Sequence, residues 1–243
     1  TETHYKTIDY GGKLLDAFRV GLPFEDAAPE IEWADTILLT SNFTQEAGVV
    51  ADFISFAKSV NPGVRCIVGG SDAMVQRGEV DRHRYYYEHG ADFVGGGDGE
   101  TVLPAVLRAA TPPQQSILTD FNEVPLPALH HANLSLYVES HEGGLPDGVH
   151  PPLMYLETSR GCRQSCDFCS TPFTKGRYRY MDVDRIGEIL QYYRSYGIRT
   201  LLLIEDNILS RLDFPGGREA VLEWFRTMHR EGFLWEFANG VEI

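Results

Sequence analysis

The chain has 243 residues and 43% of them are hydrophobic, which is enough to build one large or two small globular domains. Its 35 Asp and Glu outnumber its 21 Lys and Arg, and the net charge of −14 argues against nucleic acid as the main partner, because such a protein must neutralise phosphates. No apolar run approaches the roughly 20 residues of a membrane span and no signal peptide is visible, so we expect a cytoplasmic protein without a membrane partner.

The first half of the chain alternates short apolar runs with helical stretches, which is typical of a parallel sheet covered by helices. Strands are expected at residues 4–10, 36–40, 65–68 and 92–94. Helices are expected at residues 49–60, 85–89 and 101–110. Residues 1–110 are therefore predicted to form one α/β domain.

Small or polar residues follow three of these strands. An open parallel sheet binds ligands at this carboxyl edge, because glycines let a ligand approach the backbone and helix N-termini present free N–H groups. The alternative is that the glycines only form tight turns. The candidate residues at these strand ends are Ser41, Asn42, Gly69, Gly70, Ser71, Gly95, Gly96, Gly97, Asp98, Gly99 and Glu100.

Residues 111–152 are rich in proline and show little periodicity, so they are predicted to be a linker that crosses the surface. Four histidines fall in this segment, and a metal site made from them is one reading. Scattered loop histidines are more often solvated, and we interpret them so. They are His130, His131, His141 and His150.

A predicted strand at residues 153–158 runs directly into a loop with three cysteines, Cys162, Cys166 and Cys169, in a C-x3-C-x2-C spacing. Thiolates brought together by one short loop suit an iron–sulfur cluster, and three ligands leave one iron with an open position. A structural zinc site is the alternative. Such a site usually has a fourth ligand, and the remaining cysteine, Cys66, is distant in the sequence.

After the cysteine loop, helices expected at residues 186–196 and 218–231 alternate with strands expected at 200–204 and 234–239. Together with the strand at 153–158 they form three βα steps. Between the loop and the first of these helices, basic residues occupy alternate positions, and they face either an anionic ligand or solvent. These residues are Lys175, Arg177 and Arg179.

The cysteine motif, with the aromatic Phe168 directly before its third cysteine, resembles that of the radical S-adenosylmethionine (SAM) enzymes. The resemblance implies that Cys162, Cys166 and Cys169 hold a [4Fe–4S] cluster whose fourth iron chelates the amino and carboxylate groups of SAM. Reduction, by a donor such as flavodoxin or ferredoxin, would cleave SAM to a 5′-deoxyadenosyl radical. It also implies that Phe168 lies beside the adenine, whereas the alternative is ordinary packing within the loop.

Glu205, Asp206 and Asn207 follow the second strand of this domain, at the position where the resembling family binds the amino group of SAM. A carboxylate there can accept hydrogen bonds from an ammonium group, and an amide can hold a hydroxyl. The alternative is that Asp206 or Asn207 caps the helix that follows.

The first domain resembles the cobalamin (B12)-binding domain that precedes the radical core in one branch of this family. The turn at residues 97–100, Gly-Asp-Gly-Glu, is an altered form of that branch's GEGE turn, and Val-Pro-Leu-Pro at 124–127 resembles its connector. The resemblance implies that the candidate residues at the three strand ends contact cobalamin. The motif Asp-x-His-x-x-Gly, whose histidine ligates cobalt, is absent, because Tyr86 stands where glycine is needed after Asp81 and His83. We therefore expect cobalamin without a histidine ligand, and His83 at the surface.

The predicted fold is α/β, with an N-terminal flavodoxin- or Rossmann-like B12-binding domain at residues 1–110. The linker at 111–152 follows, and then the first half of a radical SAM (βα) barrel at 153–243. Half a barrel leaves a long sheet edge exposed, and the opening strand and helix of a B12 domain are not visible before residue 4. We therefore expect the chain to be part of a longer protein.

The resemblance implies a cobalamin-dependent methyltransferase that acts on a carbon of a small-molecule or peptide substrate in natural-product or cofactor biosynthesis. One SAM would methylate cobalamin, and the radical from another would abstract hydrogen from the substrate carbon. One alternative is a radical SAM enzyme with a corrin-free first domain that catalyses rearrangement, cyclisation or sulfur insertion. The other is a non-catalytic zinc-binding α/β module.

Overall fold

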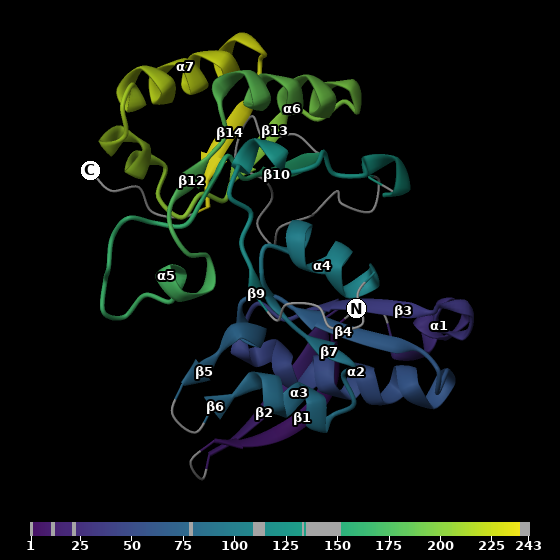
Figure 1. The fold of residues 1–243 in the computed structure, drawn as a ribbon. Coiled ribbons are helices and arrows are strands. Elements are labelled where there is room, and N and C mark those ends of the chain that lie inside the picture. Colours follow the sequence, from purple (N-terminus) through teal and green to yellow (C-terminus); the bar gives the residue numbers. More distant parts are fainter. Residues whose placement is uncertain are drawn as a thin grey trace. The chain divides into compact units, whose positions relative to one another are not determined.

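The structure, a computed structural model, describes residues 2–10, 13–20, 23–77, 80–108, 115–132, 134 and 152–238. The chain divides into two units, Thr1–Ser116 and Ile117–Ile243 (Figure 1). Each unit is built around a three-stranded parallel sheet with helices against it. The predicted α/β class with parallel sheets is therefore confirmed.

The sheet of the first unit has the order β3-β4-β7, and all its strands are parallel. Its elements are β3 (Thr36–Thr40), α2 (Ala47–Val60), β4 (Arg65–Gly69), α3 (Arg82–Glu88), β7 (Phe93–Val94) and α4 (Gly99–Arg108), preceded by α1 (Ala28–Trp33). The strands and helices predicted between residues 36 and 108 are present; β3 has the predicted ends, and the other ends are shifted by up to three residues. Residues 109 and 110, the predicted end of the last helix, lie outside the described residues. Boundaries shift because end residues are decided by caps and turns.

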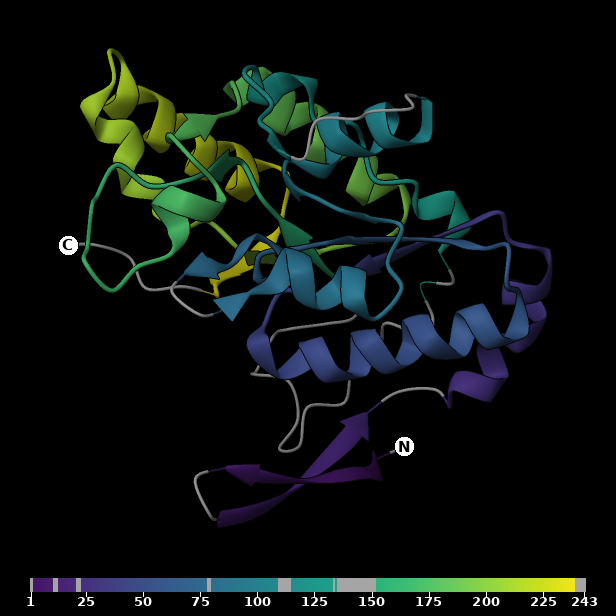
Figure 2. The ribbon, with the colours of Figure 1, turned by 60° about the horizontal axis from the view of Figure 1, so that its bottom comes forward.

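Neighbouring side chains of the central strand β4 point to opposite faces of the sheet, and different helices cover these faces. Cys66 and Val68 are buried among side chains of α1, α2 and α3. Ile67 is buried with Phe93 and the apolar side of α4 on the other face (Figures 1 and 2). The first unit is therefore a sheet between two helical layers.

The first unit also contains three strand pairs outside this sheet. The hairpin of β1 and β2 contains the strand predicted at residues 4–10, while its second strand was not predicted (Figure 2). The pairs are β1 (Glu2–Tyr10) with β2 (Lys13–Val20) and β5 (Gln76–Arg77) with β6 (Val80–Asp81), both antiparallel, and β8 (Gly96–Gly97) with β9 (Gln115–Ser116), which is parallel.

Helix α3 begins earlier than the periodicity of residues 85–89 predicts. The Asp81 carboxylate accepts a hydrogen bond from the backbone N–H of Arg84 at 3.0 Å and so caps the helix. His83 lies in the first turn and is half-buried rather than fully at the surface, and burial lowers its pKa. The Asp-Arg-His run is therefore a helix start.

The sheet of the second unit has the order β10-β13-β14, again all parallel, and each strand is one step further along the chain. Its elements are β10 (Leu153–Leu156), β11 (Ser159–Arg160), α5 (Thr171–Thr174), β12 (Arg179–Tyr180), α6 (Val183–Ser195), β13 (Thr200–Leu203), α7 (Gly217–Arg230) and β14 (Leu234–Phe237). The predicted strands and helices of residues 153–237 are thus present.

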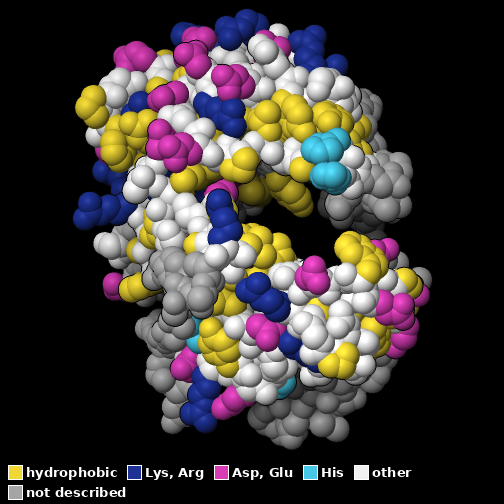
Figure 3. Space-filling view, turned by 45° about the vertical axis from the view of Figure 1, so that its right-hand side comes forward, with side chains coloured by type: hydrophobic (Ala, Val, Ile, Leu, Met, Phe, Trp, Pro, Cys, Tyr) yellow, Lys and Arg dark blue, Asp and Glu magenta, His cyan; other side chains and the backbone are white. Residues whose placement is uncertain are grey.

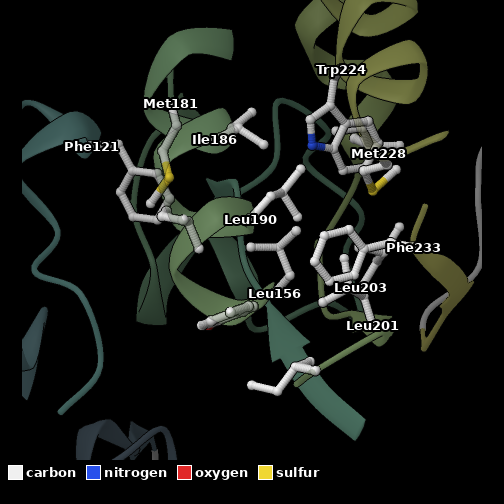
Figure 4. Close-up of a cluster of buried hydrophobic side chains, with 14 of the residues drawn as sticks. Phe121, Leu156, Met181, Ile186, Leu190, Leu201, Leu203, Trp224, Met228 and Phe233 are labelled. Atoms are coloured by element: carbon white, nitrogen blue, oxygen red, sulfur yellow. The ribbon is translucent and has the colours of Figure 1, made fainter. Parts of the chain in front are cut away.

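Helices α6 and α7 bury one face of this sheet. Leu201 and Leu203 of β13 are fully buried and meet Leu190 of α6 and Met228 of α7 (Figure 4). A buried leucine side chain contributes roughly 1.5–3 kcal/mol relative to exposure, so this cluster holds the strand ends firmly. The carboxyl ends of β10 and β13 consequently form a rigid edge.

Part of the segment predicted as a linker belongs to the core of the second unit. Leu118, Phe121 and Leu129 are buried in the same cluster as Leu156. Within residues 117–134 the chain therefore packs against the sheet's helices instead of only crossing the surface. His130 and His131 are exposed, with ring centroids 4.0 Å apart, whereas His141 and His150 lie outside the described residues.

None of the described helices is both long and apolar enough to cross a membrane. On the face shown in Figure 3, the Lys and Arg side chains of the described residues are interspersed with Asp and Glu side chains. This face therefore carries mixed charge and no continuous basic patch among its described residues.

Candidate functional site

The cysteine loop leaves the carboxyl edge of the second unit's sheet, between β11 and β12. These two strands pair antiparallel, with Ser159 opposite Tyr180 and Arg160 opposite Arg179, so the two ends of the loop run side by side. All three of its cysteines, which are Cys162, Cys166 and Cys169, are free thiols; Cys166 is exposed and the other two are half-buried. The loop thus offers three accessible sulfur ligands from one rigid base.

Gly161 marks how closely the two ends of the loop approach each other. Its φ is +88°, which favours glycine, and a Cβ there would lie 2.8 Å from the carbonyl oxygens of both Gly176 and Arg177. No other residue type fits without moving the backbone. The glycine directly before Cys162 is therefore required by the close contact at the base of the loop.

Glu205 follows β13 and is buried, with 2% of its surface exposed. One carboxylate oxygen accepts hydrogen bonds from the backbone N–H of Thr158 at 2.6 Å and from the Thr158 hydroxyl at 2.5 Å. The other oxygen accepts from the hydroxyl of Ser159. Burial raises the pKa of Glu205 to about 7, and the hydrogen bonds from Ser159 and Thr158 offset this only in part. Glu205 thus ties the end of β13 to the segment that leads into the loop.

Asp206 reaches both ends of the cysteine loop. Its Oδ2 accepts a hydrogen bond from the backbone N–H of Gly161 at 2.9 Å. Its Oδ1 lies 3.1 Å from Nζ of Lys175, which also lies 3.9 Å from Oε1 of Glu157. The carboxylate is largely shielded, with 13% of the side chain exposed, so these contacts are less screened than those of a surface pair.

Asn207 contacts the first cysteine. Its amide nitrogen lies 4.0 Å from Sγ of Cys162, and Oγ of Ser210 lies at the same distance. The backbone N–H of Gln164 donates to that sulfur at 3.4 Å. The carbonyl oxygen of Asn207 accepts from the N–H of Leu209 at 3.1 Å, so Asn207 also caps the 3-10 helix Ile208–Asp213, which was the alternative given for it.

The aromatic residue next to the third cysteine does not pack within the loop. Phe168 is 93% exposed, and Phe173 of α5 is 80% exposed. The two residues stand on either side of Cys169 in the sequence. The packing alternative for Phe168 is therefore wrong in this structure, and the adenine prediction stays a prediction.

The basic residues that follow the loop mostly bind the protein itself. Arg179 donates to the backbone carbonyls of Lys175 at 2.6 Å and Leu118 at 2.7 Å. Its guanidinium also lies over the ring of Phe121, 5.9 Å from the ring centroid. Arg177 is exposed. Of the three, Lys175 and Arg179 therefore support the loop.

The described residues include no group of three or more His, Cys, Asp or Glu side chains arranged around a single metal ion. Cys66, the fourth thiol considered for zinc, is fully buried in strand β4 of the first unit, and burial raises its pKa. Because zinc binds the thiolate form, the burial that raises this pKa disfavours Cys66 as the fourth ligand of such a site. An iron–sulfur cluster instead spreads its thiolates over separate irons.

A cavity of about 140 Å³ lies at the carboxyl ends of β3, β4 and β7 in the first unit. Six of the predicted glycines line it, and apolar side chains that sequence reasoning missed form its walls, including Leu38, Ile67 and Phe93. Ser41, Asn42, Ser71, Asp98 and Glu100 do not line it. The lining glycines are Gly69, Gly70, Gly95, Gly96, Gly97 and Gly99.

The glycines that line this cavity differ in whether the fold requires a glycine at their position. A Cβ at Gly70 or Gly97 would lie 2.3 or 2.0 Å from the backbone oxygen of Ser41 or Ser116, and both glycines have a positive φ, so the fold itself requires these two. A Cβ at Gly96 would clash with the side chain of Met74, which is flexible and can move. A Cβ at Gly69 would meet only the carbonyl oxygen of Gly95, at 3.8 Å. The turn alternative therefore explains Gly70 and Gly97, but it leaves Gly69 free to bear a side chain.

A buried polar network lies behind the loops that follow β3 and β4. The Tyr86 hydroxyl lies 2.8 Å from Ser41 Oγ and 3.0 Å from Asp72 Oδ2. Asp72 also accepts from Thr44 and from Arg82. Burial raises the pKa of Tyr86 to about 12. Ser41 is thus a structural residue, and Asp72, Tyr86 and Arg82 were missed because their meeting depends on tertiary packing.

Residues 156–232 match the family model of the Radical SAM superfamily. Among curated proteins, cytidylyl-2-hydroxyethylphosphonate methyltransferase from Streptomyces wedmorensis is 31% identical over 133 residues, which are 54% of this chain and 24% of that protein. The ribosomal protein uS12 methylthiotransferase RimO of Chlorobium phaeobacteroides is 26% identical over 201 residues, 82% of this chain and 39% of that protein.

Among solved structures, the radical S-adenosylmethionine methyltransferase TsrM from Kitasatospora setae has a similar fold. A structure with tryptophan and a SAM analogue aligns with a TM-score of 0.56 at 16% identity, covering 85% of this chain and 43% of TsrM. A second structure, with cobalamin and a [4Fe–4S] cluster bound, gives a TM-score of 0.52. The chain therefore spans less than half the length of these proteins.

Proposed function

Because this chain belongs to the radical SAM superfamily, we propose that it is part of a cobalamin-dependent radical SAM methyltransferase. The substrate proposed is a small molecule or peptide that is methylated on carbon. The second unit would bind the [4Fe–4S] cluster and SAM, as the beginning of a (βα) barrel. The first unit would bind cobalamin as a flavodoxin- or Rossmann-like domain.

The observation that supports this proposal best is the cysteine loop, whose two ends are paired with each other through β11 and β12. Cys162, Cys166 and Cys169 are free thiols on a loop whose two ends are held at the carboxyl edge of a parallel sheet. That edge is where α/β proteins bind ligands. The soft donor set and the half-buried setting fit an iron–sulfur cluster with one open iron.

When bound, a [4Fe–4S] cluster supplies the electron for reductive cleavage of SAM, and cobalamin supplies a carrier for a methyl group. The chain's own residues prepare the site. Gln164 N–H donates to Cys162 Sγ, and Asn207 and Ser210 lie beside it, so this sulfur can carry negative charge. The exposed ring of Phe168 offers a stacking surface for an adenine.

The glycine-lined cavity of the first unit supports cobalamin less directly. It is lined by glycines and apolar side chains, and its volume of about 140 Å³ has room for only a part of a large organic ligand. At Gly69 the fold has no steric need for glycine, so the open space there is consistent with a ligand approaching the backbone. The two TsrM structures share the fold, and one of them holds cobalamin.

A radical SAM enzyme with a corrin-free first domain is the second candidate, with sulfur insertion as its chemistry. The match to the methylthiotransferase RimO covers 82% of this chain, including residues of the first unit, so that class fits the length as well. The steric explanation of Gly70 and Gly97 also removes part of the support for a ligand in the cavity.

Anaerobic reconstitution of the chain with iron, sulfide and hydroxocobalamin separates the candidates. Iron and sulfide together with corrin absorbance after gel filtration support the first, and iron and sulfide alone support the second. Zinc without iron after purification and reconstitution would overturn both. Cleavage of SAM to 5′-deoxyadenosine with dithionite then tests the cluster's function.

The variant Gly69→Leu tests the cavity itself. We expect it to lower cobalamin binding at least tenfold without changing the iron content, because the added side chain fills the space that the ligand needs. Gly63→Leu is the matched control, since a Cβ there meets only Asn61 Oδ1 at 3.5 Å and Gly63 does not line the cavity. Equal binding by both variants would contradict cobalamin binding in this cavity.

A further inference from the structure

Both carboxylate oxygens of Asp206 bind groups of the protein itself, whereas a ligand-binding carboxylate was expected here. Its two oxygens point to opposite ends of the cysteine loop: Oδ2 accepts from the N–H of Gly161, and Oδ1 lies 3.1 Å from Nζ of Lys175. Gly161 directly precedes the first cysteine, and Lys175 directly follows α5, beyond the third. One carboxylate therefore contacts both ends of the segment that carries all three thiols.

Other contacts around Asp206 also join the two ends of the cysteine loop. A Cβ at Gly161 would lie 2.8 Å from the carbonyl oxygens of Gly176 and Arg177, so the backbones already touch there. Arg179 donates to the carbonyl of Lys175 at 2.6 Å and orients the residue whose ammonium meets Asp206. Glu157 also lies 3.9 Å from that ammonium and holds Arg160 through a 2.7 Å ion pair.

Residues 205–207, which follow Ile204 after the end of β13, contact successive positions of the segment that leads into the loop. Glu205 binds Thr158 and Ser159, Asp206 binds Gly161, and Asn207 contacts Cys162. Each step along residues 205–207 thus meets a later position of residues 158–162. Since β13 is buried on its helix-facing side by Leu201 and Leu203, it is a firm template for the loop.

We propose that Asp206 is a positioning residue that joins the two ends of the cysteine loop and so holds the three thiols ready for the cluster. This inference rests on the proposed function for the meaning of the thiols, but the clamp itself is a property of the protein alone. A loop of this length that is free at one end would lose conformational entropy when it closes around a cluster. Joining the ends beforehand removes part of that cost.

The test compares the full chain with Asp206→Ala, Asp206→Asn and Lys175→Met. Alanine removes both contacts, whereas asparagine keeps an oxygen for the N–H of Gly161 and loses the charge that pairs with Lys175. Hydrogen–deuterium exchange of residues 161–175 is measured before any metal is added. The control is Glu231→Gln, which removes an ion pair of similar length, Arg194 to Glu231 at 3.0 Å, away from the loop.

We expect amide exchange in residues 161–175 to be about tenfold faster in Asp206→Ala and about threefold faster in Asp206→Asn and Lys175→Met. Peptides from α6 and α7 should be unchanged in all three variants. The double variant Asp206→Asn/Lys175→Met should exchange no faster than either single variant, because both remove the same contact. Glu231→Gln should leave the loop unchanged.

A second measurement keeps the inference separate from a direct role in SAM binding. The reconstituted protein is exposed to an iron chelator, and loss of the cluster is followed at its visible absorbance. We expect about tenfold faster loss in Asp206→Ala. Unchanged loop exchange and unchanged cluster loss, with weaker SAM binding alone, would overturn the positioning role. If the unaltered chain takes up no iron, the proposed function fails while the exchange experiment still decides the clamp.

Discussion

The carboxyl ends of the parallel strands border a cavity in the first unit, whereas in the second unit they carry side chains that bind a loop. In the first unit these ends surround a cavity of about 140 Å³ lined by glycine and apolar side chains. In the second unit the side chains of Glu205, Asp206 and Asn207 fill the corresponding place and bind the neighbouring loop. The same α/β scaffold can therefore leave room for a ligand or position a loop, depending on the side chains that follow its strands.

Each unit also has a buried carboxylate near the carboxyl ends of its strands, and the two carboxylates have different hydrogen-bond partners. Asp72 in the first unit is paired with Arg82 at 3.2 Å and receives the hydroxyl of Tyr86. Glu205 in the second unit accepts hydrogen bonds from the neutral groups of Thr158 and Ser159. Burial of Glu205 among these neutral donors raises its pKa.

The largest effect is expected from Gly97→Ala in the first unit. Gly97 has a φ of +91°, and a Cβ there would lie 2.0 Å from Ser116 O, which is a backbone atom. We expect a loss of about 3 kcal/mol in the free energy of unfolding, measured by urea denaturation. Gly99→Ala is the control, because its Cβ would meet only Leu103 at 3.9 Å. Equal stability of both variants would remove the steric explanation.

The next largest effect is expected in the pH dependence of the free energy of unfolding, through Glu205. Its folded pKa is raised to about 7 from an ordinary value of 4.5, so its protonated form is favoured in the folded state. The corresponding stability is fully present below pH 4.5 and is lost as pH rises through about 7. Relative to Glu205→Gln, the unaltered chain should lose roughly 3 kcal/mol across this range. Urea unfolding at several pH values checks this, and parallel curves for the two proteins would contradict it.

A smaller effect is expected from Asp72→Asn. The amide keeps an oxygen for only one of the two hydroxyl donors, Thr44 and Tyr86, which bind different oxygens of Asp72, and it loses the charge that Arg82 pairs with. We expect a loss of about 1–2 kcal/mol in unfolding free energy, because a largely buried guanidinium is left without its partner. If thermal unfolding of Asp72→Asn matched that of the unaltered chain, the polar network around Asp72 would not contribute to stability.

The smallest effect should come from Asn207→Ser in the reconstituted protein. Serine keeps the helix cap but removes the amide beside Cys162 Sγ. Because a donor near a thiolate stabilises the more negative, reduced cluster, its removal should lower the midpoint potential by on the order of tens of millivolts. A potentiometric titration followed by electron paramagnetic resonance measures this. A potential that stays unchanged or rises would show that the amide does not act on the sulfur.

Much of the fold was predictable because its signals are local. The apolar runs at β3, β4 and β13 and the helical periodicity of α2, α6 and α7 are found within a few residues of where they were predicted. The buried part of the predicted linker was not predictable. Leu118, Phe121 and Leu129 lie among prolines without a repeating pattern, so only the packing of the second unit's core shows that they belong to it.

The sequence by itself determined the cysteine spacing, the order of strands and helices and the glycines at the strand ends, because these depend on neighbours in the chain. Only the tertiary structure decided what these residues do. It buried Glu205 against Thr158 and Ser159, placed Asp206 between Gly161 and Lys175, and separated the glycines required by the fold from Gly69. The contacts of the two carboxylates join residues 31 to 47 positions apart, and no pattern along the chain encodes which distant side chains meet.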